Sequence, residues 1–510
     1  MKKKILAAFL AVLMLILCCA CTTQSGDSAK QLVYGSGNYT AINPALFEHG
    51  EINLLLFSGL TKHNDKNEVV GDLAKDWEYD EATLTYTFNL NDNIVWHDGE
   101  KFKAEDVKFT LEAIINPDNA SENASNFEEI KAIDIVDEKT IKIELSAPSA
   151  AMPDYLTIGI LPSHLLEGKD MTTDEFNQNP IGTGPYKLKS WEMGQSIVLE
   201  KNNDFYGTVA KIDTVIFKIV EDYKVRALQL QSGELDMAQV TPQDMGEFEN
   251  NENFKVYNMK TSDYRGIMYN FGSEFFSKHK ELPNILSYAI DRQAIVSAVL
   301  LDKGEVAYSP LQAGEYNNPD MEKFSYDPEK AQSLLEEAGW EKNNSGIYEK
   351  NGEELNFVIN NGAGDQVRID MSNIAAQQLR DIGVNATVEV QSQVDWAGQD
   401  TYLIGWGSPF DPDDHTYKVF GTDQGANYSG YSNAKVDEIL LKARAATDSA
   451  ERKALYNEFQ QEIAKDMPYT FIAYVNAIYI APKDLKGITE NTILGHHGVG
   501  VFWNITDWTM

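Results

Sequence analysis

The sequence predicts an α/β protein of two lobes, and three observations support this fold class. The chain has 510 residues, about three times the length of a typical domain of ~150 residues. Hydrophobic residues make up 43% of it, which is enough for large packed cores. From residue 31 to about 271 the pattern is mostly of strands, whereas from about 272 strands alternate with helices able to cover a sheet. Each half is therefore expected to form a lobe of its own.

The first 21 residues form a leader, not part of the fold. Three lysines follow Met1, residues 5–17 are apolar and uncharged, and cysteines stand at positions 18, 19 and 21. The Ala20-Cys21 pair resembles the lipobox of bacterial lipoproteins, which implies that Cys21 is acylated and becomes the mature N-terminus. Residues 22–30 (TTQSGDSAK) are expected to form a flexible tether. Because no cysteine follows Cys21, a disulfide framework in the body is excluded.

In the first half, polar and apolar residues alternate over short runs, which is typical of strands with one buried face. The clearest runs are residues 84–90, 140–145 and 197–200. Residues 106–115 differ, because their apolar side chains recur at helical spacing. The first lobe is therefore expected to mix strands with helices.

In the second half, four longer segments have helical periodicity, and one of them follows a proline suited to a first helical turn. They are residues 286–301, 327–338, 369–382 and 435–467, the last in two pieces. Strands are expected between them at 356–360, 386–390 and 402–406. This alternation predicts a sheet covered by helices.

The charge of the chain excludes some partners. Lys and Arg number 43 against 78 Asp and Glu, a formal charge of −35. A protein this acidic is not expected to bind nucleic acid, and anionic lipid head groups would repel it. No run after residue 21 is apolar and long enough to span a bilayer. We therefore expect an extracytoplasmic protein held at the membrane by its lipid alone.

Common enzyme signatures are missing from the sequence. It has no Gly-x-Ser-x-Gly elbow, no His-Glu-x-x-His helix and no P-loop lysine. Two carboxylates that act together in glycoside hydrolysis are paired in space, and the sequence does not show that pairing. A secreted hydrolase therefore stays open as an alternative.

Residues 405–412 (GWGSPFDP) are the sharpest candidate for a binding site. A predicted strand ends abruptly here in a Gly- and Pro-rich loop that presents Trp406, Phe410 and Asp411. Loops at strand ends often hold ligands on a rigid scaffold. The alternative is that Trp406 and Phe410 only fill the core.

His496 and His497 are the only adjacent histidines, and glycines flank them. Such a pair can bind a transition metal, but with no third ligand evident they are more often ordinary polar residues of a loop. The sequence alone therefore identifies no metal site.

Seven ordered blocks make the chain similar to the extracytoplasmic solute-binding proteins of ATP-binding-cassette (ABC) importers, in the oligopeptide, dipeptide and nickel class called family 5. The blocks are residues 72–77 (DLAKDW), 86–90 (YTFNL), 96–107 (WHDGEKFKAEDV), 180–186 (PIGTGPY), 288–292 (YAIDR), 326–331 (YDPEKA) and 334–339 (LLEEAG). The resemblance covers essentially the whole mature chain.

The resemblance implies a periplasmic-binding-protein fold whose two lobes close over a ligand at a hinge crossed twice. Lobe I would comprise residues 31–272 and 478–510, with an extra subdomain at about 71–180, and lobe II residues 273–477. The family captures a solute and delivers it to a permease. A monomer is expected, with no catalytic residue, cofactor or resident metal.

The family leaves the ligand open. In its peptide-binding members, an Asp soon after the Gly-Trp of lobe II binds the peptide's α-ammonium. Pro409 and Phe410 stand at that place here, so Asp411 or Asp413 would have to substitute.

The same run also resembles the nickel-chelate members, in which a Trp and a second aromatic stack on the chelate. The arginines that hold the chelate's carboxylates there have no evident counterpart at residues 124–127 or 157–161. A short peptide is favoured. A metal chelate, with a bond from His415, His496 or His497, is the alternative, and a sugar or other solute comes third.

Overall fold

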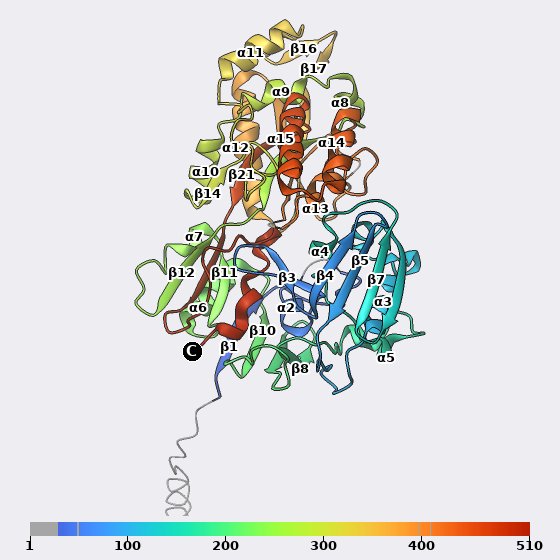
Figure 1. Cartoon of the computed structure of the whole chain (residues 1–510). Helices are drawn as coiled ribbons and strands as arrows, with labels where there is room; N and C mark the ends of the chain where they lie inside the picture. Colours follow the sequence, from blue (N-terminus) through green and yellow to red (C-terminus); the bar gives the residue numbers. More distant parts are fainter. Residues whose placement is uncertain (1–28, 48–49, 397, 409) are drawn as a thin grey trace, which may run out of the picture.

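The computed structural model describes residues 29–510 except 48, 49, 397 and 409. Two lobes lie one above the other, and the lower lobe carries an extra subdomain on the right of the view (Figure 1). The predicted leader, Cys21 and residues 22–28 of the tether lie outside the described residues.

A seven-stranded sheet forms the centre of the first lobe. β1 runs parallel to β10 and β11, and the other pairs are antiparallel. In sheet order the strands are β12 (Phe254–Met259), β22 (Ala477–Pro482), β11 (Met237–Val240), β1 (Gln31–Ser36), β10 (Thr214–Ile219), β9 (Ser196–Lys201) and β8 (Tyr186–Glu192). Both faces are covered, because Leu32 and Tyr34 belong to one apolar cluster while Val33 packs against another. Helices α6 (Tyr223–Ser232) and α7 (Pro242–Met245) follow β10 and β11.

The extra subdomain is a four-stranded antiparallel sheet with one long helix. The strands, in sheet order, are β4 (Ala74–Asp80), β5 (Thr85–Leu90), β7 (Thr140–Leu145) and β6 (Ile130–Asp137), and the helix is α3 (Ala104–Ile115). Its core is continuous with that of the lobe, since Phe88 and Leu32 belong to the same cluster. The shorter elements nearby are α2 (Asn53–Leu56), β2 (Thr61–His63), β3 (Val69–Gly71), η1 (Pro117–Asn119), η2 (Ala124–Asn126), α4 (Met152–Tyr155), α5 (Ser163–Leu166) and η3 (Glu175–Asn177).

The second lobe has a six-stranded sheet covered by helices. In sheet order its strands are β14 (Gly304–Val306), β21 (Tyr469–Val475), β13 (Tyr264–Tyr269), β20 (Thr401–Trp406), β18 (Asn356–Gly362) and β19 (Asn385–Gln391). The helices are α8 (Glu274–Lys278), α9 (Leu282–Ser287), α10 (Arg292–Leu300), α11 (Pro328–Glu337), α12 (Gln366–Ile382), α13 (Asp413–Phe420), α14 (Ala434–Ala445) and α15 (Ser449–Asp466). A small sheet of β15 (Glu341–Lys342), β16 (Tyr348–Lys350) and β17 (Glu353–Glu354) lies beside α11 at the far end (Figure 1).

Two details differ from the sequence prediction. The chain first crosses between the lobes at residues 260–263, not at 272, because β13 pairs with β20 and β21 of the second sheet. All six residues of β13 are buried, and such a run does not reveal to which sheet it belongs.

The helix predicted at 286–301 is two helices, since the Asp291 side chain caps a new helix by accepting from the Ala294 N–H at 2.9 Å.

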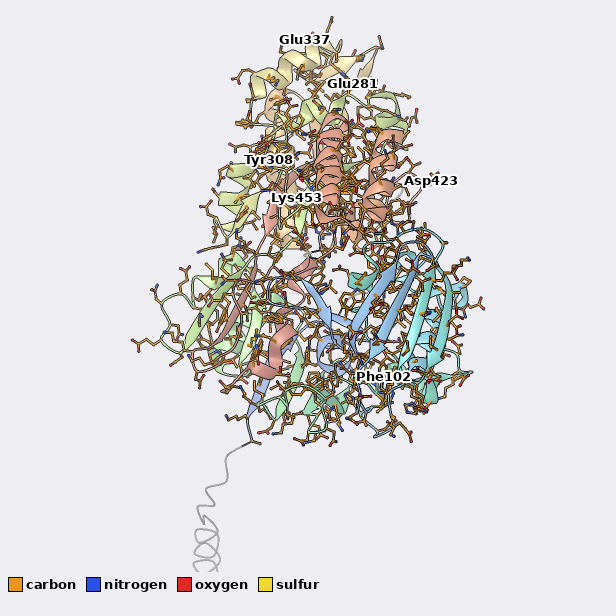
Figure 2. All side chains as sticks on the ribbon, viewed as in Figure 1. Phe102, Glu281, Tyr308, Glu337, Asp423 and Lys453 are labelled. Atoms are coloured by element: carbon orange, nitrogen blue, oxygen red, sulfur yellow. The ribbon has the colours of Figure 1, made fainter. Side chains whose placement is uncertain are left out.

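The cores of the two lobes are separate, and the second crossing lies at Asn476, between β21 and β22. Figure 2 shows Phe102 in the extra subdomain, whereas Glu281 and Glu337 lie at the far end of the second lobe. Because no apolar cluster of the described residues spans both lobes, a hinge motion about the two crossings would leave each core intact. None of the helices in the described residues is long and apolar enough to cross a bilayer.

Candidate functional site

A short loop after β22 carries the two adjacent histidines to the junction of the lobes. It consists of η4 (His496–Gly498) and leads through Val499 into η5 (Val501–Asp507). Gly498 has a φ of +77°, and a Cβ there would lie 2.6 Å from the Cβ of Ala477, so only glycine fits. The Tyr479 hydroxyl of β22 donates to the Gly498 carbonyl at 3.0 Å, which fixes the loop to the first sheet.

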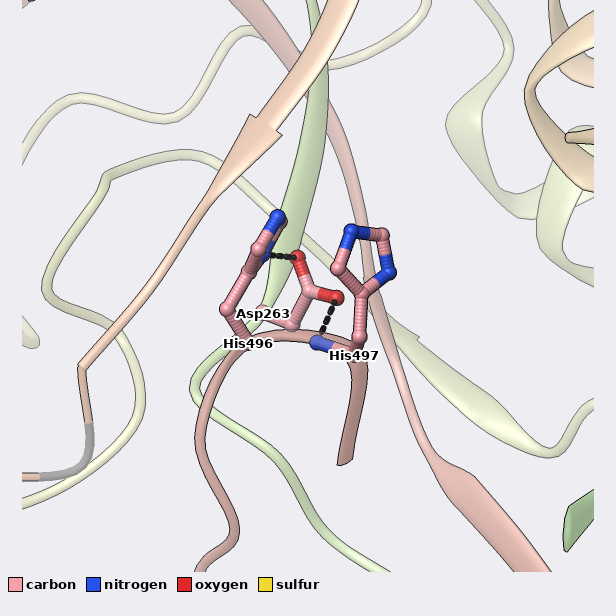
Figure 3. Close-up of side chains that lie close together, drawn as sticks. All are labelled: Asp263, His496 and His497. Carbon is pink, nitrogen blue, oxygen red and sulfur yellow. Dashed lines mark hydrogen bonds and ion pairs between the residues drawn. The ribbon is translucent and has the colours of Figure 1, made fainter. Parts of the chain in front are cut away.

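Asp263, at the first crossing, holds both histidines (Figure 3). One carboxylate oxygen lies 2.8 Å from Nδ1 of His496, and the other accepts from the backbone N–H of His497 at 3.0 Å. The same carboxylate forms an ion pair with Arg265. Burial opposes ionisation of Asp263, but Arg265 and the histidines outweigh it and hold the pKa of Asp263 well below its usual range.

Burial favours the neutral form of both imidazoles. Burial lowers the pKa of His497 to about 3 and also lowers that of His496, for which Asp263 only partly compensates. Oxygen and nitrogen atoms of Asp263, His496 and His497 lie within 4.8 Å of one another. The tautomer of His496 with its proton on Nδ1, facing Asp263, has an unprotonated Nε2, the form of the ring nitrogen that coordinates a transition metal. Asp263 is thus the neighbour of these histidines that the sequence did not reveal.

A cavity of about 550 Å³ lies on the hinge side of this loop, lined by residues of both lobes, among them Asp222, Thr261, Arg265, Asp365 and His497. The side chain of Arg265 is 5% exposed, and its Nε has no hydrogen-bond partner in the described part of the chain. Arg368 of α12 forms an ion pair with Asp365 at 3.0 Å, and burial together with Arg265 lowers the pKa of Arg368 to about 10. A buried donor without an acceptor suits the carboxylate of a ligand.

Two smaller cavities, called here the front chambers, lie on the other side of the loop. The first has a volume of about 250 Å³ and is lined by residues that include Asn53, Asp154 and Ser408. The second has a volume of about 300 Å³ and is lined by residues that include Lys62 and Trp503. Phe410 lines both front chambers, so the structure places this predicted site residue at a cavity.

Trp406, the other predicted aromatic, lines none of these three cavities. It is half-buried at the end of β20 and begins a row of stacked rings: its centroid is 6.0 Å from that of Tyr428, which lies 5.4 Å from that of Trp396. The aromatic wall predicted from Trp406 and Phe410 is therefore divided between a ring stack and the front chambers.

The structure places Asp411 and Asp413, one of which was predicted to bind a ligand's ammonium group, in ion pairs with arginines. Both Asp411 oxygens accept from Arg452 of α15, one at 2.6 Å, and the pair is buried. Asp413 pairs with Arg444 at 3.1 Å and accepts from the Tyr155 hydroxyl of the first lobe at 2.7 Å. Asp411 also lines the first front chamber, and Oδ1 of Asp413 has no hydrogen-bond partner among the described residues, so the predicted role of these carboxylates in binding stays a prediction.

His415, the third histidine considered as a ligand, lies away from the pair that Asp263 holds. Its Nδ1 is 2.9 Å from Asp414 within α13, and its ring lies against Trp406. It does not belong to the group of Asp263, His496 and His497.

Glu51 anchors the other end of the histidine loop and was not predicted from the sequence. Its Oε1 accepts from the backbone N–H groups of Gly500 at 2.9 Å and Val501 at 3.3 Å. No ion pair to Glu51 occurs among the described residues, and burial raises its pKa to about 7 against the opposing effect of these N–H groups. Three tyrosines, Tyr34, Tyr39 and Tyr479, surround it.

We expect Glu51→Gln to remove part of the protein's pH-dependent stability. The folded pKa of about 7 lies above the ordinary value of 4.5, so the stabilisation is present below about pH 4.5 and is lost as the pH rises through 7. The shift corresponds to about 3 kcal/mol. Urea unfolding of both proteins at about pH 5 and pH 8 measures it. The wild type should lose more stability over this range than the variant, and equal losses would contradict the assignment.

Sequence reasoning missed Asp263, Arg265 and Glu51 as parts of this site. Asp263 and Arg265 flank Tyr264 at the first crossing, and two opposite charges at the start of a mostly apolar run were the available signal. Glu51 is 449 residues from Gly500 along the chain, so no local pattern connects them.

Comparison with known proteins decides the family. Residues 68–428 match the sequence model described as bacterial extracellular solute-binding proteins, family 5 (middle region). The chain belongs to this family. The fold and the family predicted from the seven blocks are thereby confirmed. Family 5 proteins are extracytoplasmic substrate-binding proteins of ABC transporters and not enzymes.

Two relatives show the range of ligands among similar solute-binding proteins. The oligopeptide-binding protein AppA of Bacillus subtilis is 30% identical over 99% of both chains. Its structure with a nonapeptide has a TM-score of 0.82 over 95% of this chain and all of that one. NikZ from Campylobacter jejuni, solved in complex with Ni(L-His), is 39% identical, with a TM-score of 0.89 over 95% of this chain and all of NikZ.

Proposed function

We propose that this family 5 protein is the receptor of an ABC importer for a small metal chelate, in which a transition metal is held by an amino acid such as histidine. The observation that carries the proposal is the pair of neutral imidazoles, His496 and His497, fixed by Asp263 at the junction of the lobes. Imidazole suits nickel, copper and zinc ions, and the carboxylate behind His496 raises its basicity as a ligand. The 39% identity to NikZ, which was solved with Ni(L-His), supports the same ligand class.

The hinge-side cavity offers a place for the organic part of the chelate. Arg265 presents a buried Nε without a partner among the described residues, and a carboxylate of the chelating amino acid would be an acceptor for it. Acidic side chains such as Glu221 and Asp222 line the same cavity and would face the cationic metal complex.

A short peptide, favoured by the sequence analysis, is the second candidate. AppA supports it, being 30% identical and solved with a nonapeptide. Against it stand the ion pairs with Arg452 and Arg444, which already offset the charges of Asp411 and Asp413, the carboxylates predicted to bind a peptide's ammonium group.

Delivery to the permease of the importer, a monomeric state and an anchor at acylated Cys21 are further parts of the proposal. The family supports the first, and the lipobox-like Ala20-Cys21 supports the anchor.

Calorimetry with the purified protein tests the ligand class. We expect a binding isotherm with nickel and L-histidine together, and weaker heat or none with nickel alone, with histidine alone or with a mixture of short peptides. Binding of the peptide mixture with no heat from the nickel–histidine mixture would make the protein a peptide receptor instead.

A further inference from the structure

Arg444 of α14 is a buried arginine that contacts both lobes. Its Nε lies 3.1 Å from the carboxylate of Asp413 in its own lobe, and its Nη1 donates to Glu128 of the first lobe at 3.3 Å. Its backbone carbonyl accepts from the N–H of Ala150, also in the first lobe, at 2.8 Å. Because Arg444 is only 5% exposed, these bonds lie inside the interface between the lobes.

Asp413 receives a further bond from the first lobe. The Tyr155 hydroxyl, at the end of α4, donates to Oδ2 of Asp413 at 2.7 Å, and Arg444 pairs with the same oxygen. Tyr155 and Asp413 are both buried. Beside them, the hydroxyl of Thr447 donates to Glu81 of the first lobe at 3.0 Å. The end of α14 and Asp413 together thus form several hydrogen bonds across the interface.

The first-lobe partners come from residues 81–155, in and beside the four-stranded sheet of the extra subdomain. Figure 1 shows α14 above this subdomain. The chain itself crosses between the lobes elsewhere, at residues 260–263 and at Asn476. A hinge motion about the crossings would therefore separate α14 from its first-lobe partners.

Such a motion would break two charge-assisted bonds, Arg444 to Glu128 and Tyr155 to Asp413. Hydrogen bonds with an ionised partner are roughly twice as strong as neutral ones. The fold of the second lobe does not depend on them, since Arg444 and Asp413 neutralise each other within that lobe. The two bonds therefore act on the arrangement of the lobes and not on either core.

We propose that the Arg444–Asp413 pair is a latch, which holds the two lobes in the closed arrangement through Glu128 and Tyr155. Neither member of the pair lines any of the three cavities, so both are positioning residues that slow release of the ligand without contacting it. The latch goes beyond the proposed function, because it acts on the lobes whatever solute lies between them.

The test removes the latch from the first-lobe side, with Tyr155→Phe and Glu128→Ala in one variant. Phenylalanine keeps the ring of Tyr155, the Glu128 side chain is 46% exposed, and the Arg444–Asp413 pair stays intact. Small-angle X-ray scattering of the purified protein, with no ligand added, measures the arrangement of the lobes. We expect the wild type to scatter as the closed arrangement does and the latch variant to have a larger radius of gyration.

Tyr257→Phe with Glu490→Ala is the matched control. It makes the same two changes in the first lobe, at a buried tyrosine and a half-exposed glutamate that both contact Lys255. Its radius of gyration should equal that of the wild type. In stopped-flow measurements, nickel–histidine should dissociate about tenfold or more faster from the latch variant and at the wild-type rate from the control.

Thermal unfolding shows whether each variant is folded, and Glu128→Ala alone replaces the latch variant if the double change is not tolerated. Equal radii of gyration in the latch variant and the wild type would overturn the proposal, as would wild-type scattering that fits separated lobes. Failure of nickel–histidine to bind the wild type would count against the proposed function alone, because the scattering comparison needs no ligand.

Discussion

Replacing His496 and His497 together with alanine is expected to abolish nickel–histidine binding, a loss of at least about a hundredfold in affinity. Burial keeps both imidazoles neutral, so wild-type binding needs no deprotonation of either ring near pH 7. The loop should survive the substitutions, because Asp263 accepts from the backbone of His497 and the Tyr479 hydroxyl donates to Gly498.

His164→Ala is a matched control for this experiment. His164 also lies 2.8 Å from a carboxylate, that of Asp98, but in the extra subdomain and lining none of the three cavities. Calorimetry should show its nickel–histidine affinity unchanged. Wild-type nickel–histidine affinity in the double alanine variant would show that this loop does not coordinate the metal.

Much of the fold could be predicted from local patterns. The alternating runs predicted strands that the structure has as β5 and β7, and the periodic segments correspond to helices such as α11 and α12. The first crossing was misplaced because β13 is buried at every position, and its pairing with β20 joins residues more than 130 apart in the chain. Periodicity reports which face is buried and says nothing of the partner strand.

The site was harder to predict because its members are distant in sequence. The sequence shows that His496 and His497 are adjacent. The carboxylate that contacts them belongs to Asp263, which is 233 residues from His496 along the chain. Asp411 and Asp413 became candidates because the family resemblance calls for a carboxylate near this Gly- and Pro-rich loop, but their burial and the arginines of later helices that pair with them are not visible in the local sequence.

Replacing Asp411 with Asn is expected to destabilise the protein by about 3–5 kcal/mol, the cost of breaking a buried ion pair. The substitution keeps the shape and removes the charge, so the Arg452 guanidinium remains buried between Tyr316 and Tyr456 without an anion. Urea unfolding measures the loss. A second change, Arg452→Met, removes the stranded charge and should restore much of the stability, because replacing both members of a buried pair costs far less than removing one.

The expected loss separates a structural role for Asp411 from a role in binding. Glu438→Gln is the control, since it breaks an exposed pair with Lys442 in the same lobe and should not change stability measurably. If Asp411 serves the fold, folded Asp411→Asn protein should still bind ligand, and its unfolding midpoint should fall. Unchanged stability with lost binding would mean that Arg452 tolerates the loss of its partner and that the Asp411 carboxylate contacts the ligand. That result would revive the ammonium-binding role first inferred from the sequence, because only a cationic ligand group would need the charge that asparagine lacks.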